Sequence, residues 1–288
     1  MIATVGALLE KAVRDLVADR DVADARRESQ VLLGFALGVS RAWLTTHPDH
    51  AADSESAAKF RSLVALRVSG HPVAYLLGVK EFYGLPLRVT PDVLIPRPET
   101  EELVEAALAR LPQGEARKVL DLGTGSGCIA IAIARQRPAA KVAAVDSSSP
   151  ALALARENAA ALDVEAEFLQ SNWFAALGRR RFDLIVANPP YVAADDPHLR
   201  EGDLRFEPRP ALAAGADGLA DLRRIVGDAP KHLRPGGWLL LEHGYDQAEA
   251  CRDLLHDAGF GELVFRADIA GLPRIAGGRL LTPDSPSR

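Results

Sequence analysis

The sequence is poor in several features that mark particular classes of protein. Its 288 residues include only two cysteines, Cys128 and Cys251, which lie far apart and form no Cys-x-x-Cys pair. We therefore expect neither a disulfide framework nor a zinc site, and we expect a reducing compartment. The seven histidines show no ligand spacing such as His-x-x-x-His, so we predict no metal site.

Long apolar runs and surplus positive charge are also missing. The longest apolar stretches, such as 31–39 and 128–134, are too short to cross a bilayer. The amino-terminal residues lack the charged, apolar and small-residue sections of a signal peptide. The net charge of −5 argues against a protein that holds nucleic acid through phosphate contacts alone. We expect a cytoplasmic protein with no membrane association and no direct nucleic-acid binding.

Residues 1–70 have the pattern of a small helical bundle. Their apolar positions recur at spacings of three and four, which predicts amphipathic helices. Asp24 and Ser40 are the expected caps of the second and third helices, and a fourth helix is expected over 54–69. That fourth helix is expected to turn these side chains inward: Phe60, Leu63, Val64 and Val68.

The rest of the chain divides into a linker and a larger domain. Residues 71–98 contain two short apolar segments around a turn at 84–86, which predicts a β-hairpin linker. In residues 99–288 strands and helices alternate, which predicts a parallel sheet covered on both faces. The predicted fold class is α/β, with a doubly wound, mostly parallel seven-stranded sheet. Its strands are expected at 118–122, 141–146, 165–170, 182–187, 238–242, 263–266 and 279–282.

A glycine-rich loop follows the first predicted strand of this domain. Gly123, Gly125 and Gly127 are preceded by Asp121, and Cys128 stands where a dinucleotide-binding loop has its third glycine. This variant matches the cofactor loop of S-adenosylmethionine methyltransferases. Its backbone donors can meet the methionyl carboxylate, and the acidic side chain can face the ammonium directly or through water. The expected cofactor contacts in this loop are Asp121, Gly123, Thr124, Gly125, Ser126 and Gly127.

Two positions beyond the loop extend the candidate cofactor site. Asp146 ends the second predicted strand, where an acidic side chain accepts hydrogen bonds from ribose hydroxyls. Its alternative role is to cap the following helix, although Ser149 is better placed for that. Trp173 follows the third strand and can flank the adenine, with ordinary packing as its alternative role. Both residues are therefore predicted to bind the cofactor.

The most informative segment is Asn188-Pro189-Pro190-Tyr191, directly after the apolar run 182–187. The asparagine oxygen and a backbone carbonyl beside the prolines can accept both hydrogens of a planar NH2 group, while the prolines add no competing N–H. The tyrosine ring can lie against the flat face of that group. We predict that Asn188, Pro189 and Tyr191 are catalytic residues. We also predict that all four residues of the segment, including Pro190, contact the substrate and that Asn188 contacts the cofactor. A turn that merely ends the strand is the alternative.

With these motifs, the chain resembles the release-factor glutamine methyltransferases, the family called PrmC or HemK. The resemblance spans nearly the whole chain and also rests on segments 70–78, 81–85, 94–101 and 207–212. It implies the class I methyltransferase fold and S-adenosylmethionine as cofactor. It further implies methylation of the glutamine in the Gly-Gly-Gln motif of peptide chain release factors, which the amino-terminal bundle helps to dock.

Parts of these motifs are also compatible with other substrates and activities. A sister family that modifies a ribosomal-protein glutamine shares Asn-Pro-Pro-Tyr but tends to differ in segment 95–100. The exocyclic amine of a nucleic-acid base is also planar with two hydrogens, although the acidic balance counts against it. Cys128 disfavours a nicotinamide oxidoreductase, and the intact tetrapeptide disfavours a module that binds the cofactor without turnover.

Overall fold

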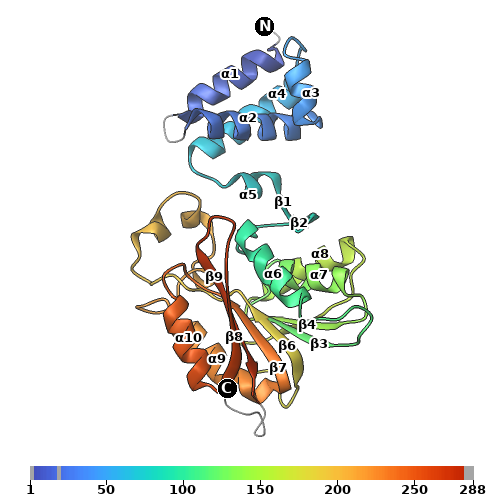
Figure 1. Cartoon of the computed structure of the whole chain (residues 1–288). Helices are drawn as coiled ribbons and strands as arrows, with labels where there is room; N and C mark the ends of the chain where they lie inside the picture. The colour runs from blue at the N-terminus through green and yellow to red at the C-terminus, as the bar shows by residue number, and fades with distance from the viewer. Residues whose placement is uncertain (1–2, 18–20, 282–288) are drawn as a thin grey trace. The chain divides into compact units, whose positions relative to one another are not determined.

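A computed structural model of the chain describes residues 3–17 and 21–281 (Figure 1). The contacts divide the chain into two compact units, Met1–Val79 and Lys80–Arg288. The roles and bounds of the three segments expected from the sequence stay a prediction. None of the helices within the described ranges has both the length and the hydrophobicity that crossing a membrane requires.

The first unit is a helical bundle in which the first four helices begin at side-chain caps. Thr4, Asp21, Ser40 and Asp53 each accept a hydrogen bond from the backbone N–H three residues on. The prediction for Ser40 is confirmed, whereas that for Asp24 is wrong because the second helix starts earlier and Asp21 caps it. The helices are α1 (Val5–Leu16), α2 (Val22–Leu37), α3 (Arg41–Thr46), α4 (Ser54–Val68) and the short α5 (Val73–Leu77).

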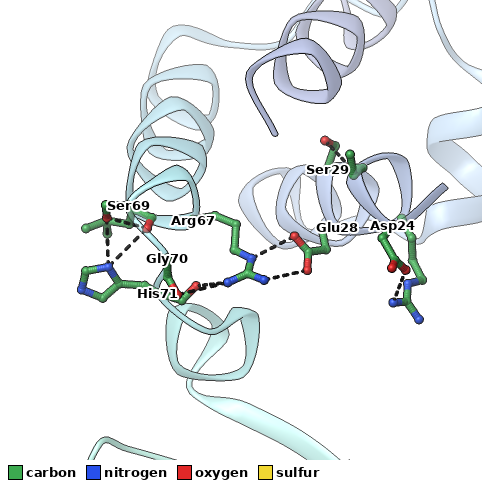
Figure 2. Close-up of polar contacts among 10 residues, drawn as sticks. Asp24, Glu28, Ser29, Arg67, Ser69, Gly70 and His71 are labelled. Carbon is green, nitrogen blue, oxygen red and sulfur yellow. Dashed lines mark hydrogen bonds and ion pairs between the residues drawn. The ribbon is translucent and has the colours of Figure 1, made fainter. Parts of the chain in front are cut away.

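An inward-facing arginine fixes the end of α4. Arg67 donates from Nε and Nη2 to the two carboxylate oxygens of Glu28 on α2, at 2.9 and 3.0 Å, as Figure 2 shows. Its Nη1 donates to the carbonyls of Gly70 and His71, so the buried charge is well satisfied. Val68, predicted to point inward, is 42% exposed, because at this end of the helix Arg67 takes the inward position.

A two-stranded hairpin precedes the larger sheet. It consists of β1 (Val79–Phe82) and β2 (Leu85–Arg88). The turn lies at Tyr83 and Gly84, both with positive φ, so the predicted turn at 84–86 is placed one residue too late. Within the predicted linker 71–98, α5 was not predicted, because five residues are too few to show helical periodicity.

The second unit contains a seven-stranded sheet of order β5-β4-β3-β6-β7-β9-β8. β3 to β7 are parallel, and β9 runs antiparallel to both of its neighbours. The predicted fold class is confirmed. The strands are β3 (Lys118–Leu122), β4 (Lys141–Asp146), β5 (Glu167–Gln170), β6 (Phe182–Ala187), β7 (Leu233–Glu242), β8 (Phe260–Ala267) and β9 (Pro273–Leu280).

Helices cover both faces of this sheet (Figure 1). They are α6 (Glu101–Leu108), α7 (Cys128–Gln136), α8 (Ser149–Ala161), α9 (Ala220–His232) and α10 (Ala248–Asp257). Successive strand residues point to opposite faces. Val119 therefore packs into the core formed with α6 and α7, and Leu120 into the core formed with α9 and α10. The parallel strands all end at one edge, where α/β proteins bind their ligands.

Candidate active site

The glycine loop after β3 adopts backbone conformations that suit glycine. Gly123, Gly125 and Gly127 have φ values of 72°, 55° and 86°. The N–H groups of Gly123 and Thr124 donate to the carbonyl of Val145, at 2.8 and 3.0 Å, which ties the loop to β4. A Cβ at Gly127 would come within 2.9 Å of the side chain of Ile131. The third glycine therefore serves the close packing of α7.

Asp146 connects the glycine loop with the start of α8. Its Oδ2 accepts from the N–H of Gly125 at 2.9 Å, and its Oδ1 accepts from the N–H of Ser148 at 2.8 Å. Ser148 is the cap of α8, because its side chain accepts from the N–H of Ala151; the prediction of Ser149 as cap is wrong by one residue. A carboxylate has about four acceptor sites, so Asp146 keeps capacity for a ligand.

A pocket of about 340 Å³ opens beside Asp146. Its wall includes the segments at the carboxyl ends of the parallel strands β3, β4, β5 and β6. The long connection 192–218 also contributes to it. The predicted site residues that line it are Gly123, Gly125, Asp146, Trp173, Asn188 and Pro190. Those that lie outside its wall are Asp121, Thr124, Ser126, Gly127, Pro189 and Tyr191. A larger groove between α7, α8 and the edge strand β5 contains none of the predicted residues.

Trp173 lies directly against the glycine loop. A Cβ built on Gly123 would come within 3.2 Å of the indole ring, and this contact together with the φ of 72° favours glycine at this position. The indole Nε1 donates to Asp221 at 3.1 Å, and Ser171 donates to the Trp173 carbonyl at 2.7 Å. These bonds hold a non-glycine residue at φ 52°, a conformation that costs about 1–3 kcal/mol. The ring lines the pocket and also packs against the core, and the contact with adenine stays a prediction.

Asp121 is fully buried beneath the loop. Its Oδ2 accepts from the hydroxyl of Thr124 at 2.6 Å and from the N–H of Ala130 at 3.2 Å. Its Oδ1 has no hydrogen-bond partner among the described residues, and burial raises the pKa of this carboxyl to about 7. The contact with a ligand ammonium stays a prediction, and Oδ1 is the free acceptor that would make it.

The Asn-Pro-Pro-Tyr segment follows the end of β6 and is held from two sides. Asn188 donates from Nδ2 to the hydroxyl of Thr100 at 3.1 Å. Its Oδ1 receives no hydrogen bond within the described residues, and the side chain lines the pocket. Tyr191 donates from its hydroxyl to Glu242 at 3.3 Å, and its carbonyl accepts from Gln247 at 3.0 Å. The tyrosine thus anchors the segment, and its hydroxyl faces the protein interior.

Three residues of this site were not singled out from the sequence. Thr100 and Glu242 are only 2% and 1% exposed and lie behind Asn188 and Tyr191. Burial raises the pKa of Glu242 to about 7. Glu207 is also buried; it accepts from the N–H of Ile95 at 3.0 Å and forms an ion pair with Arg97. Glu207 therefore joins segments 94–101 and 207–212, which the sequence had marked only by their resemblance to the family.

The connection 192–218 is ordered by short-range hydrogen bonds. It contains three 3-10 turns, η3 (Pro197–Arg200), η4 (Leu204–Phe206) and η5 (Arg209–Ala211). Val192 pairs with Ala213 in a parallel bridge beside the tetrapeptide. The residues of this connection that line the pocket are Pro208, Pro210 and Ala211. The connection therefore forms part of the wall of the pocket.

Comparison with known proteins relates both units to one enzyme family. The PrmC N-terminal domain matches residues 7–78, and the methyltransferase small domain matches residues 102–201. The release factor glutamine methyltransferase of Bordetella pertussis is 51% identical, over 93% of this chain and 99% of its own length. The enzyme of the same name from Burkholderia pseudomallei is 52% identical, over 90% of this chain and 92% of its own length.

A solved structure supports the fold of the second unit. The Thermus thermophilus 16S rRNA methyltransferase RsmC, in complex with AdoMet and guanosine, superposes with a TM-score of 0.52 at 25% identity. That match covers 70% of this chain and 49% of the other. The resemblance seen in the sequence motifs is confirmed across nearly the full length of the curated relatives. The chain belongs to the family of release factor glutamine methyltransferases.

Proposed function

We propose that this enzyme methylates the side-chain amide nitrogen, N5, of the glutamine in the Gly-Gly-Gln motif of peptide chain release factors. This modification would tune translation termination in the cytoplasm. One observation carries the proposal. Asn188 gives its NH2 end to Thr100 and leaves its oxygen free at the wall of the pocket. A free amide oxygen beside two prolines suits a guest that brings N–H donors, as a glutamine side chain does.

S-adenosylmethionine is the proposed methyl donor, and the pocket fits it. Its volume lies within the range of small-molecule sites, about 300–1,000 Å³. Asp146 offers acceptors for ribose hydroxyls, Trp173 a ring for the adenine, and the loop at Gly123 and Gly125 close backbone approach. Asp121 lies behind the loop, outside the pocket wall, and its Oδ1 has no hydrogen-bond partner among the described residues, so this oxygen is the proposed acceptor for the ammonium, directly or through water. When bound, the cofactor supplies an electrophilic methyl group on a sulfonium. The remaining loop residues, Thr124, Ser126 and Gly127, would support this site from behind.

The protein's part in the reaction is to hold and orient the substrate amide. A carboxamide nitrogen is a weak nucleophile because its lone pair is delocalised into the carbonyl. The Oδ1 of Asn188 and the carbonyl of Pro189 would accept its two N–H bonds, with Pro190 at the pocket wall and Tyr191 anchoring the segment. As positive charge develops on the nitrogen, these two acceptors bind it more strongly than in the ground state.

The amino-terminal bundle is the proposed docking module. In this proposal residues 1–70 bind the release factor and residues 99–288 carry out the methyl transfer. Residues 71–98 connect these two parts. The match of residues 7–78 to a domain named for this family supports a dedicated role. Deleting residues 1–70 should raise the Michaelis constant for an intact release factor more than for a short Gly-Gly-Gln peptide. Equal increases for both substrates would contradict the docking role.

The decisive experiment maps the methylated atom. The enzyme is incubated with isotopically labelled S-adenosylmethionine and a purified release factor, and the labelled residue is located by mass spectrometry. We expect the label on the glutamine of Gly-Gly-Gln, and none on a release factor with alanine at that position. Parallel reactions contain ribosomal proteins or RNA as acceptors. Labelling of a ribosomal-protein glutamine or of a base, with the release factor unlabelled, would refute the proposal.

A further inference from the structure

We propose that Gln247 is a positioning residue that holds the backbone of the Asn-Pro-Pro-Tyr segment in place for methyl transfer. This inference rests on the proposed function, in which the Oδ1 of Asn188 and the carbonyl of Pro189 accept the substrate N–H groups. Oxygens that accept from a substrate have to stay free of bonds within the protein, so the segment has to be held through other atoms. A misplacement of about 1 Å can slow a reaction about a hundredfold.

The main chain of the segment has few points of attachment. Pro189 and Pro190 have no N–H to donate. Within the part of the chain that the structure describes, the carbonyls of the Pro-Pro-Tyr part accept one hydrogen bond, from the Nε2 of Gln247 to Tyr191 at 3.0 Å. The other two attachments run through the side chains of Asn188 and Tyr191. Gln247 is therefore the residue that fixes the backbone at the end of the segment.

A tight turn holds Gln247 itself. Its main-chain N–H donates to the carbonyl of Gly244, and its Oε1 accepts from the Gly244 N–H, both at 2.9 Å. The turn is tied to the sheet, because the N–H of His243 donates to the carbonyl of Arg274 on β9 at 2.9 Å. Since Gly244 presents an N–H and Tyr191 a carbonyl, only one orientation of the Gln247 amide satisfies both. The side-chain amide thus connects the segments that follow β6 and β7.

Gln247 also occupies a position that does not favour glutamine. It is the N-cap of α10, yet its side chain makes no capping hydrogen bond to that helix. N-cap positions favour serine, threonine, aspartate or asparagine, whose side chains bond to the first helical turn. Such departures from a local preference are expected at functional sites. The Gln247 side chain serves the neighbouring strand end in place of its own helix.

Gly218 packs against the hydrogen bond between Gln247 and Tyr191. Its φ is 73°, and a Cβ at this position would lie 2.3 Å from the Tyr191 oxygen and 2.8 Å from the Nε2 of Gln247. Gly218 is the last residue of the connection 192–218, which also forms part of the pocket wall. A side chain at this position would displace one or both of these atoms. The glycine and the glutamine therefore set the position of the Tyr191 carbonyl together.

The test uses Gln247→Glu, which keeps the shape of the side chain and changes one hydrogen-bonding group. When ionised, the introduced carboxyl still accepts from Gly244, but its second oxygen faces the oxygen of Tyr191 without a proton between them. When protonated, the carboxyl donates to Tyr191 and restores the bond. Burial favours the protonated form, since Gln247 is 8% exposed. The variant therefore switches one hydrogen bond on and off with pH.

At about pH 8 the kcat of Gln247→Glu should be at least about tenfold below that of the wild type, with the dissociation constant for S-adenosylmethionine unchanged. The ratio of the variant kcat to the wild-type kcat should rise as the pH is lowered to about 5.5, because protonation restores the donor. Gln113→Glu, at an exposed position, should keep the wild-type kcat throughout. A wild-type kcat in Gln247→Glu, or a lowered kcat whose ratio to the wild type stays constant with pH, would overturn the proposal.

The ratio removes the titration of the native groups, which both proteins share. The titratable and charged groups on the segments around Gln247 are Tyr191, Asp217, Glu242, His243, Asp246, Glu249 and Arg274. A loss of folded protein would lower kcat equally at every pH at which the fold is stable. A merely structural role of Gln247 therefore gives no recovery of the ratio at low pH.

A second variant and a measurement on the unmodified protein cover the case in which Gln247→Glu fails to fold. Of the five glutamines in the chain, only Gln247 is buried. With 15N-labelled glutamine, its NH2 protons should exchange with solvent at least about tenfold more slowly than those of the exposed Gln113. Single substitutions of the other four glutamines assign the signals. In Gly218→Ala, this exchange should become at least about tenfold faster and kcat should fall at least about tenfold. Exchange of Gln247 as fast as that of Gln113 in the unmodified protein would overturn the proposal.

Failure of the proposed function is recognised separately. The kcat comparison uses whichever acceptor the wild type labels in the mapping experiment. If this acceptor is not a release factor, the proposed function is refuted, and the comparison still decides whether Gln247 positions the segment. A release factor that the wild type and Gln247→Glu methylate with the same kcat at every pH would refute the positioning role alone.

Discussion

Replacing Glu242 by glutamine should flatten the dependence of stability on pH. The Glu242 carboxyl is 1% exposed, and its Oε2 has no partner among the described residues. Burial raises its pKa from an ordinary value of 4.5 to about 7, although Thr100, Tyr191 and Arg274 favour the ionised form. The ionised carboxylate is therefore poorly accommodated in the folded protein. A neutral glutamine of the same shape removes this titration.

The size and sign of the effect follow from the two pKa values. The folded protein binds the proton more tightly than the unfolded chain does. The contribution of Glu242 to stability is thus complete below about pH 4.5 and is lost as the pH rises through about 7. The whole difference corresponds to about 3 kcal/mol, of which about 2 kcal/mol falls between pH 5 and pH 8. Between these two pH values, the free energy of unfolding of the wild type should therefore fall by about 2 kcal/mol more than that of Glu242→Gln.

Urea denaturation of both proteins at about pH 5 and about pH 8 measures the effect. The amide NH2 of glutamine has its own burial cost, but this cost is independent of pH and cancels when the two pH values are compared. Glu165→Gln is the matched control because Glu165 is exposed, and it should keep the wild-type pH dependence. A wild type and a Glu242→Gln variant that change equally between the two pH values would refute the reasoning.

Two further substitutions test the candidate site. Asn188→Ala removes the free Oδ1 and should lower kcat about a hundredfold or more, with S-adenosylmethionine binding by calorimetry largely intact; wild-type turnover would refute its role. Asp146→Ala removes the acceptor for Gly125 and Ser148, as well as the one proposed for the ribose. The cofactor dissociation constant should rise about tenfold or more. Asp253→Ala, at an exposed position on α10, is the control, and an unchanged constant in Asp146→Ala would contradict the assignment.

The parts of the site that depend on local sequence were the most predictable. Gly123, Gly125 and Asp146 stand at strand ends, where a short motif fixes both the turn and the side-chain direction. Errors of a few residues arose where several polar residues compete for one task. Asp21 caps α2 in place of Asp24, and Ser148 caps α8 in place of Ser149. Each candidate has a suitable side chain, and only the packing of the helix decides which one is its cap.

Strand lengths were predicted less well, for a related physical reason. β9 runs over Pro273–Leu280, but its middle contains Gly277, a residue that is depleted in strands. In the structure a Cβ at Gly277 would come within 2.5 Å of the Leu239 carbonyl, so close approach to β7 demands glycine there. β7 begins at Leu233 and continues through Gly236 and Gly237, which look like a turn in the sequence. Tertiary contacts override the local preference in both strands.

The residues behind the Asn-Pro-Pro-Tyr segment were missed because only the strand order brings them there. β6 pairs with β7 in the register Ala187↔Leu241, so Asn188 and Glu242 each follow a paired residue at the same edge of the sheet. Thr100 is the last residue of η2 (Pro98–Thr100). It belongs to the same segment as Ile95, whose N–H donates to Glu207. Once the order β3-β6-β7 is known, a buried carboxyl at the end of β7 can be placed next to the segment that follows β6, and in the structure it accepts from Tyr191. The acidic end of an apolar strand next to a binding motif is therefore a signal for a supporting residue, provided that the neighbouring strand is identified first.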